Sequence, residues 1–266
     1  MGNEGTSPVR APAVAGVFYP ADPRTLAHLV DRLLAEADAS LDPAPRAIVA
    51  PHAGYAYSGP IAASAFSTLA AAAPGIDRVV VIGPAHRVPL RGMAVPAAER
   101  FATPLGAVRI DREAAAGVGL AASELAHRLE HSLEVEVPFL QRVLPEGFAL
   151  VPIVVGDCAP AEVGATLDAL CRDAATLLVV SSDLSHYLPY ERARAKDRQT
   201  AQMVVDLDER GLTHDRACGA TALAGLLWLT RRRGWRARLL DLRNSGDTSG
   251  DAGGGVVGYG AFAIYD

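Results

Sequence analysis

The sequence predicts an α/β fold: a three-layer sandwich in which helices cover both faces of a mostly parallel or mixed central sheet. Several runs, among them residues 79–82 (VVVI) and 177–180 (LLVV), are continuously apolar, which is typical of strands buried on both faces. These runs alternate with stretches whose apolar residues recur at helical spacing, a pattern that favours layered α/β architecture. Glycine and proline between the runs leave room for some antiparallel strands.

The length and composition bound the size of the fold. With 266 residues, half of them hydrophobic, the chain can enclose one large core. We therefore expect a single domain over residues 1–266, in which residues 1–10 form a loose, polar N-terminal arm.

The charge and cysteine content exclude several classes of protein. A formal net charge of -5 and a pI near 5.8 argue against nucleic-acid binding, and the one basic run, Arg231–Arg233, fits the last turn of a helix. No apolar stretch approaches the ~20 residues that span a bilayer, and no signal-peptide pattern opens the chain. The three cysteines, Cys158, Cys171 and Cys218, are not closely paired, which favours reduced thiols. We expect a cytoplasmic protein without nucleic-acid or membrane partners.

The helices are predicted from apolar periodicity and capping residues. Residues 21–37 begin with Asp22 as an N-cap and carry leucines at helical spacing. Ser58 and Pro60 are expected to open the second helix, and Asp111 to cap the third. The helices after the first are predicted within residues 58–73, 111–120, 132–144, 161–175, 189–211 and 218–234.

The strands are predicted within residues 47–57, 79–87, 148–157, 177–187, 235–246 and 256–266. Residues 88–110, rich in proline and short β-forming runs, predict a hairpin-like excursion at an edge. Residues 244–251 (NSGDTSGD) predict an acidic, glycine-rich loop that could rim a cleft. Gly253, Gly255 and Gly258 match the spacing of a dinucleotide fingerprint, but they lead into a strand instead of a helix, so we predict no nucleotide site.

Three of the predicted strands end in a polar segment that carries a histidine. His52 follows the first, His86 follows the second, and Asp183 with His186 follows the strand that begins near Leu177. If these strands are parallel, their carboxyl ends share one edge of the sheet, where open α/β sheets bind their ligands. We therefore expect the three segments to meet in one cleft.

His52, His86 and Cys218 form the candidate metal set. Two neutral imidazoles and one thiolate make a three-ligand shell with an open position, as catalytic metal sites have. Cys218 stands where a helix is predicted to begin, and a helix N-terminus lowers the pKa of a thiol. Each residue alone is more simply a structural one, such as a small buried thiol or a hydrogen-bonded loop histidine. Their joint occurrence at three predicted loops favours the metal site.

Acid–base groups accompany this set. Asp183 and His186 are expected to act beside the metal, since a carboxylate near an imidazole fixes its tautomer and raises its basicity. His131 and Glu134 could supply a further base and a metal-orienting carboxylate, or equally a capping histidine and an acid that favours a helix N-terminus. A Ser-His-Asp hydrolase is not expected, because the nucleophile elbow is absent and Ser181 and its neighbours share one loop with their own acid and histidine.

Several motifs point jointly to one family. VAGVFYP, APHAGYAYSG, VVVIGPAHR, EHSLEVEVPFLQ, SSDLSHY, ACGATA, NSGDTSGD and VVGYGAFAIY occur in this order between Val14 and Tyr265. Together they resemble the Memo family, also described as AmmeMemoRadiSam system protein B. That family is similar in fold to the catalytic subunit of class III extradiol ring-cleavage dioxygenases, which use mononuclear nonheme iron, so the resemblance implies an extradiol-dioxygenase-like sandwich.

The resemblance also assigns positions in the site. It matches the family's metal ligands to His52, His86 and Cys218, and further pocket residues to Asp183, His186 and His131. Glu136 departs from the pattern, because some eukaryotic members have a histidine there whose role does not carry over. The dioxygenases use a carboxylate where this chain has Cys218, so ring cleavage does not carry over with the fold.

Two functions follow from this resemblance. The first is a redox enzyme that uses one iron or copper ion, with zinc also allowed by ligand softness, on a small-molecule or modified-peptide substrate. Other proteins of the AmmeMemoRadiSam system would be its partners. The second is a noncatalytic module that binds a peptide or a partner protein in the same cleft. The clustered titratable groups favour the first, because binding alone does not require them.

Overall fold

A computed structural model describes residues 8–37 and 44–266. Its helices are α1 (Pro23–Glu36), α2 (Tyr55–Phe66), α3 (Arg112–Gly117), α4 (Glu124–His127), α5 (Val137–Val143), α6 (Pro160–Leu170), α7 (Tyr190–Val205), α8 (Ala220–Arg233) and α9 (Ser245–Ser249). Its strands are β1 (Val9–Arg10), β2 (Ala47–Ala50), β3 (Arg78–Pro84), β4 (Met93–Val95), β5 (Arg100–Thr103), β6 (Gly106–Ile110), β7 (Ala121–Ala122), β8 (Ala149–Val155), β9 (Thr176–Ser181), β10 (Arg236–Asn244) and β11 (Gly258–Tyr265).

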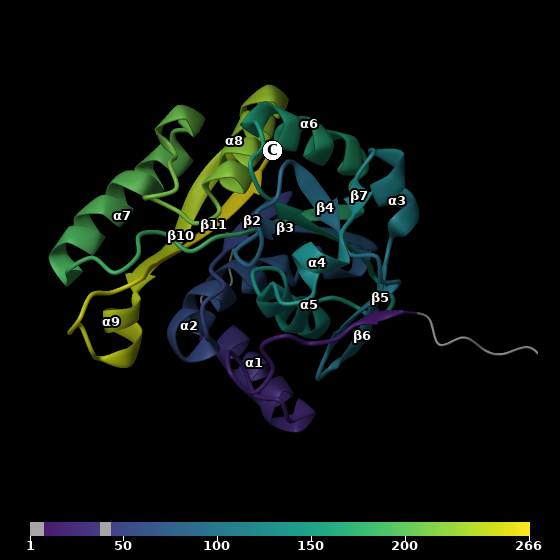
Figure 1. The fold of residues 1–266 in the computed structure, drawn as a ribbon. Coiled ribbons are helices and arrows are strands. Elements are labelled where there is room, and N and C mark those ends of the chain that lie inside the picture. The colour runs from purple at the N-terminus through teal and green to yellow at the C-terminus, as the bar shows by residue number, and fades with distance from the viewer. Residues whose placement is uncertain (1–7, 38–43) are drawn as a thin grey trace, which may run out of the picture.

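The strands form one mixed sheet, in the order β1-β5-β6-β8-β3-β9-β2-β11-β10, with β4 paired to β8 and β7 outside this path (Figure 1). The central strands β8, β3, β9 and β2 are parallel, as their continuous apolar runs predict. β11 and β10 continue the sheet in antiparallel fashion. β5 and β6 form the hairpin predicted within residues 88–110.

Side chains of the central strands alternate between two cores. Ile48 and Ala50 of β2 contribute to a core that includes residues of α1, α2 and α5. Ala47 and Val49 of the same strand contribute to a second core with residues of α6, α7 and α8. The sheet therefore lies between two helical layers, and the predicted three-layer sandwich is confirmed.

Three predicted elements differ in detail. α2 begins at Tyr55 and holds Pro60 in its interior, because the Ser58 hydroxyl donates to the Ala53 carbonyl oxygen at 2.7 Å instead of capping a helix. The helix predicted from residue 132 starts as a 3-10 turn over residues 134–136 and becomes α5 only at Val137. Residues 245–249 are helix α9 instead of a loop, because Asn244 caps this helix in a capping box.

The predicted N-terminal arm is shorter than residues 1–10. Residues 1–7 lie outside the described residues, but β1 (Val9–Arg10) pairs in parallel with β5. Arg10 is buried and forms an ion pair with Glu134, whose side chain is fully buried. The arm prediction was wrong for residues 8–10, because sequence polarity did not reveal that a distant carboxylate would neutralise this arginine.

None of the helices in the described ranges has the length and apolar character that crossing a bilayer requires.

The close contact between α6 and α8 depends on two glycines. A Cβ atom at Gly164 would lie 2.4 Å from Trp228 Cε3 and 2.8 Å from the Gly225 carbonyl oxygen. We expect Gly164→Ala to lower the free energy of unfolding by about 1–3 kcal/mol, because the helices must separate to admit the methyl group. Urea unfolding measures this loss. Gly117→Ala, where a Cβ meets nothing within 4 Å, is the matched control, and equal stability of both variants would contradict the prediction.

Candidate metal site

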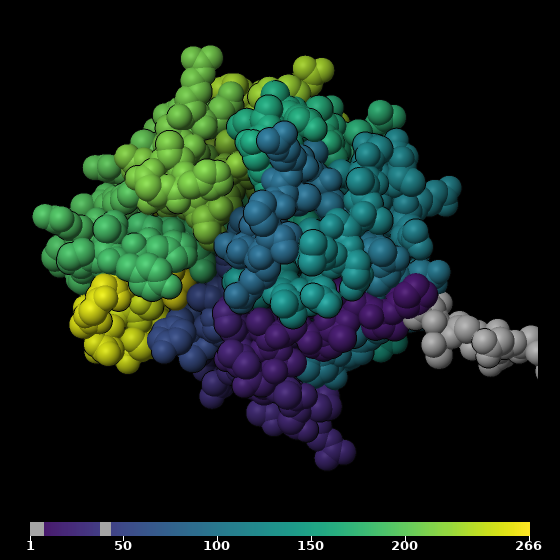
Figure 2. Space-filling view, viewed as in Figure 1, coloured from purple at the N-terminus to yellow at the C-terminus, as the bar shows by residue number. Residues whose placement is uncertain are grey.

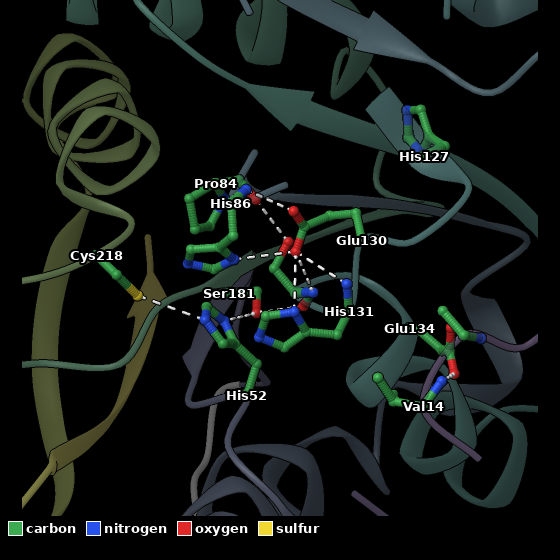
Figure 3. Close-up of polar contacts among 12 residues, drawn as sticks. Val14, His52, Pro84, His86, His127, Glu130, His131, Glu134, Ser181 and Cys218 are labelled. Carbon is green, nitrogen blue, oxygen red and sulfur yellow. Dashed lines mark hydrogen bonds and ion pairs between the residues drawn. The ribbon is translucent and has the colours of Figure 1, made fainter. Parts of the chain in front are cut away.

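The candidate metal ligands come together where the parallel strands end. His52 follows β2, His86 follows β3, and Cys218 lies two residues before α8. One ligand atom from each residue lies within 4.8 Å of those of the other two (Figure 3). β9 lies between β2 and β3 in the sheet, which explains why loops far apart in the chain meet here. The three residues can therefore hold one metal ion.

Each imidazole has its Nδ1 atom bound within the protein. His52 Nδ1 lies 2.7 Å from the Ser181 hydroxyl oxygen, and His86 Nδ1 lies 3.0 Å from Glu130 Oε1. A carboxylate oxygen only accepts, so His86 carries its proton on Nδ1 and leaves Nε2 free. His52 Nε2 lies 3.4 Å from the sulfur of Cys218. Partners of this kind orient the rings of metal-binding histidines.

The imidazoles are electrostatically suited to a cation. Burial, together with the neighbouring His86 and His131, lowers the pKa of His52 well below its usual range. Burial likewise lowers the pKa of His131 to about 4. The rings of His86 and His131 stack with centroids 4.8 Å apart. Both His52 and His131 are thus neutral near pH 7, the form in which imidazole binds metals.

Cys218 differs from its predicted electrostatic state. Burial, followed by the nearby charge of Asp183, raises the pKa of its thiol to about 12, whereas we expected a helix N-terminus to lower it. The reason is that Cys218 lies two residues before α8 and is enclosed by the end of β9. A Cβ atom at Gly219 would lie 2.8 Å from both the Ser181 carbonyl oxygen and Ser182 Cβ, so only glycine permits this close approach. A metal ion would have to displace the thiol proton.

Asp183 and His186 do not form the predicted carboxylate–imidazole pair among the described residues. Asp183 is buried, and its Oδ1 accepts from the backbone N–H of His52 at 2.8 Å. Burial raises the pKa of this carboxyl to about 7. His186 is exposed, and its Nδ1 donates to the Leu184 carbonyl oxygen at 2.8 Å. Asp183 therefore holds the His52 backbone, while Ser181 and Glu130 contact the ligand imidazoles.

Glu134 lies away from the metal ligands (Figure 3), so it is not the predicted metal-orienting carboxylate, but it begins the 3-10 turn over residues 134–136, as the alternative of an acid at a helix N-terminus predicted. Its carboxylate contacts Arg10 and accepts from the backbone N–H groups of Ala13 and Val14 and from the hydroxyl of Tyr19. Figure 3 shows Glu134 with Val14, away from the histidine cluster. This carboxylate anchors the N-terminal segment.

Glu130 is the residue that the sequence prediction missed. Its side chain is almost fully buried and lies close to the Nδ1 atoms of His86 (3.0 Å) and His131 (3.3 Å). It also accepts from the backbone N–H groups of His86, His131 and Ser132. Burial opposes its ionisation, but these bonds prevail and lower its pKa well below the usual range. Its position directly before His131 in EHSLE was the available signal.

A pocket extends from this site to the surface. It has a volume of about 780 Å³, and Figure 2 shows the hollow between the teal and the yellow-green segments. His86 and Cys218 are among the residues that line it. Its other walls are residues of the loop 84–91, the end of β8 and the approach to α8, among them Val88, Arg91, Asp157, His214 and Thr221.

Glu130→Gln is expected to weaken metal binding by about 10- to 100-fold, the usual effect of losing a partner that orients a ligand. The glutamine amide would turn N–H groups toward the backbone N–H groups of His86, His131 and Ser132, from which the carboxylate accepts. Competition with a chromogenic chelator measures the affinity. Glu146→Gln, on the exposed surface, is the matched control. Unchanged affinity in a folded Glu130→Gln variant would show that this carboxylate does not support the site.

The comparison with known proteins agrees with the family motifs between Val14 and Tyr265 of the sequence. The family model described as "Memo-like protein" matches residues 10–263. The chain belongs to the Memo-like family. It is 36% identical to a MEMO1 family protein of Methanopyrus kandleri, over 96% of this chain and 98% of that protein. A MEMO1 family protein of Methanosarcina barkeri is 34% identical over 96% and 100% of the two chains, and one of Aquifex aeolicus is 35% identical over 91% and 94%.

Proposed function

We propose that this Memo-like protein is a mononuclear metal-dependent redox enzyme, dioxygenase-like in its chemistry, that acts on a small molecule or a modified peptide. The observation that carries the proposal is that His52, His86 and Cys218 approach one another and that two of them, His86 and Cys218, line an open pocket. Three protein ligands leave a coordination position for substrate, as catalytic sites do and closed structural sites do not.

The donor set fits the metals expected from the family resemblance. His52 and His86 would each offer an Nε2 atom, and Cys218 a thiolate, a combination that suits iron(II), copper or zinc. We favour iron or copper, because such an ion when bound would supply the electron transfer that these side chains lack. The residues around the ion would bind the substrate, orient it and transfer protons to or from it.

Three residues are proposed to move or hold protons. His131 stacks on His86, which lines the pocket, and is neutral near pH 7, so it is proposed to accept a proton beside the metal. Asp183, with a pKa raised to about 7 by burial, can exist in either form near neutral pH. His186 has its Nδ1 bound to Leu184, which leaves Nε2 for a substrate.

The pocket walls suggest how a substrate is held. Val88 and Leu90 provide apolar contact, and Arg91, Asp157 and His214 provide charged and polar groups. A substrate with an apolar part and at least one ionic group would match this lining.

A noncatalytic binding module is the second candidate, and exposed aromatic residues favour it. Tyr187 is 78% exposed and Tyr57 is 46% exposed. Burial, then the charge of Asp183, and to a lesser extent these two tyrosines raise the pKa of Tyr259, so both tyrosines lie in the same region as Asp183. Such tyrosines are frequent in protein-binding surfaces. A peptide, or another protein of the AmmeMemoRadiSam system, would be the partner. A cytoplasmic location remains a prediction.

Metal analysis and oxygen uptake test the first proposal. Protein purified without added metal is expected to contain iron or copper near one ion per chain. Loaded protein should consume oxygen when a small-molecule extract or a peptide fraction is added, and Cys218→Ala should not. If the wild type contains no metal and neither His52→Ala nor Cys218→Ala changes the metal content, the enzyme proposal is overturned. Bound metal without oxygen uptake would favour the binding module.

A further inference from the structure

Ser181, at the end of β9, has more hydrogen-bond contacts than its one proton can serve. Its buried hydroxyl oxygen lies 2.6 Å from the Ser132 carbonyl oxygen, 2.8 Å from Glu136 Oε1 and 2.7 Å from His52 Nδ1. All of these residues are buried. A hydroxyl group donates one hydrogen bond and accepts up to two. The identity of each partner therefore decides where the protons lie.

The Ser132 carbonyl oxygen can only accept, so the Ser181 proton is directed to it. The two remaining contacts must then be donated to the Ser181 oxygen. A neutral His52 can donate from Nδ1 only if its single ring proton is on that atom, which leaves Nε2 unprotonated. Glu136 can donate from Oε1 only as a carboxylic acid. If Glu136 were ionised and took the Ser181 proton, the 2.6 Å contact with Ser132 would join two oxygen atoms without a proton, which is unfavourable in a buried site.

We propose that Ser181 and a neutral Glu136 hold the His52 imidazole with its proton on Nδ1. Nε2, which faces Cys218, is then unprotonated and able to bind a metal ion. This inference rests on the proposed metal site and adds two positioning residues to it. Neither Ser181 nor Glu136 reaches the pocket lining, so both act through His52.

The surroundings of Glu136 favour the neutral acid. Burial raises the pKa of its carboxyl well above the usual range, opposed by the bond with Ser181 and reinforced by the charge of Asp183. After burial, Glu136 contributes to the raised pKa of Tyr55 of α2. The Tyr55 hydroxyl donates to the Val135 carbonyl oxygen and not to Glu136. Glu136 Oε2 is buried without a hydrogen-bond partner among the described residues, which a neutral acid tolerates better than a carboxylate.

The arrangement gives the two ligand histidines different supports. His86 is held by an ionised carboxylate, Glu130, whereas His52 is held by the Ser181 hydroxyl group, which donates to the Ser132 carbonyl oxygen and accepts from an uncharged acid. With Glu136 neutral, no further buried negative charge is added beside Asp183, whose charge already opposes the ionisation of Glu136. The consequence is that His52 is prepared to bind a metal ion before one arrives.

Nitrogen-15 NMR of histidine-labelled, metal-free protein tests the tautomer directly. We expect His52 to carry its proton on Nδ1 in the wild type and to become a mixture of tautomers in Ser181→Ala. Ser181→Thr, which keeps the hydroxyl group, should restore the Nδ1 form, and Thr230→Val, which removes a buried hydroxyl group of α8, should leave His52 unchanged. A wild-type His52 protonated on Nε2, or a Ser181→Ala variant without change, would overturn the proposal.

Difference infrared spectroscopy tests Glu136. The carbonyl stretch of a protonated carboxylic acid should be present in metal-free wild type at pH 7 and absent from Glu136→Gln. That variant should keep the His52 tautomer, because the amide N–H donates to Ser181 as the acid does. An unchanged spectrum would refute the neutral acid. Both measurements are made without metal. The tautomer and the neutral acid can therefore be refuted in a protein that binds metal, and they can be confirmed in a protein that does not.

Metal affinity provides a second readout. Ser181→Ala is expected to bind metal about 10- to 100-fold more weakly, whereas Glu136→Gln should bind within about threefold of wild type. Equal affinities of wild type and Ser181→Ala would show that the hydroxyl group does not prepare His52 for the ion.

Discussion

Cys218→Ala is expected to weaken metal binding by more than about 100-fold. Four-ligand structural zinc sites bind with about 10–16 kcal/mol in total, so the loss of one ligand costs roughly 3 kcal/mol, which corresponds to more than a hundredfold in affinity. His52→Ala should have a similar effect. Cobalt(II) is a suitable probe, because a bound thiolate gives it a charge-transfer absorption that disappears with the sulfur.

The other cysteines supply the control. Cys158→Ala removes a thiol in the loop before α6 and should keep both affinity and absorption, since Cys158 is absent from the cluster around His52. Because the Cys218 thiol holds its proton to a pKa of about 12, metal uptake should release that proton, and affinity should fall as the pH is lowered. If Cys218→Ala and Cys158→Ala bound cobalt equally well, the assigned ligand set would be wrong.

Arg10→Met is expected to lower the free energy of unfolding by about 3–5 kcal/mol, the usual cost of leaving one partner of a buried ion pair without the other. Glu134 would remain buried without its cation, and the Glu130 and His127 carbonyl oxygens would lose the guanidinium donor. Urea unfolding with linear extrapolation measures the difference.

A surface pair provides the comparison for Arg10. Arg32 and Glu36 lie 4.0 Å apart on α1, with side chains 66% and 67% exposed. Arg32→Met should change stability by at most about 1 kcal/mol, because exposed pairs are screened by water. Similar losses in both variants would indicate that Arg10 contributes only side-chain packing.

The sequence predicted the central sheet well, because its strands are buried on both faces. The apolar runs before His52, His86 and Asp183 are β2, β3 and β9, they are parallel neighbours, and the three loops meet at one edge. Capping residues were equally informative where the side chain had no competing partner, as for Asp22 and α1. Ser58 failed as a signal because its hydroxyl binds a carbonyl group nearer in space.

The supports of the site could not be predicted in the same way. Glu130, Ser181 and Glu136 act through hydrogen bonds to residues 44 to 129 positions away, and sequence spacing contains no such geometry. The pKa of Cys218 was predicted in the wrong direction because enclosure by β9 outweighs its place near a helix N-terminus. Spacing from His131 left two roles equally open for Glu134, in the site or at a helix N-terminus; it begins a short 3-10 turn, and its carboxylate contacts Arg10.

The order of strands has a consequence for biosynthesis. β2 is made early, but its two neighbours in the sheet are β9 and β11, and β11 contains residues 258–265. β9 can pair with one edge of β2 once residues 176–181 have been made, but the other edge of this apolar strand stays unpaired until residues 258–265 follow. Because long-range pairing of this kind slows folding and exposes strand edges, we expect the newly made chain to be prone to aggregation through that edge until β11 is in place.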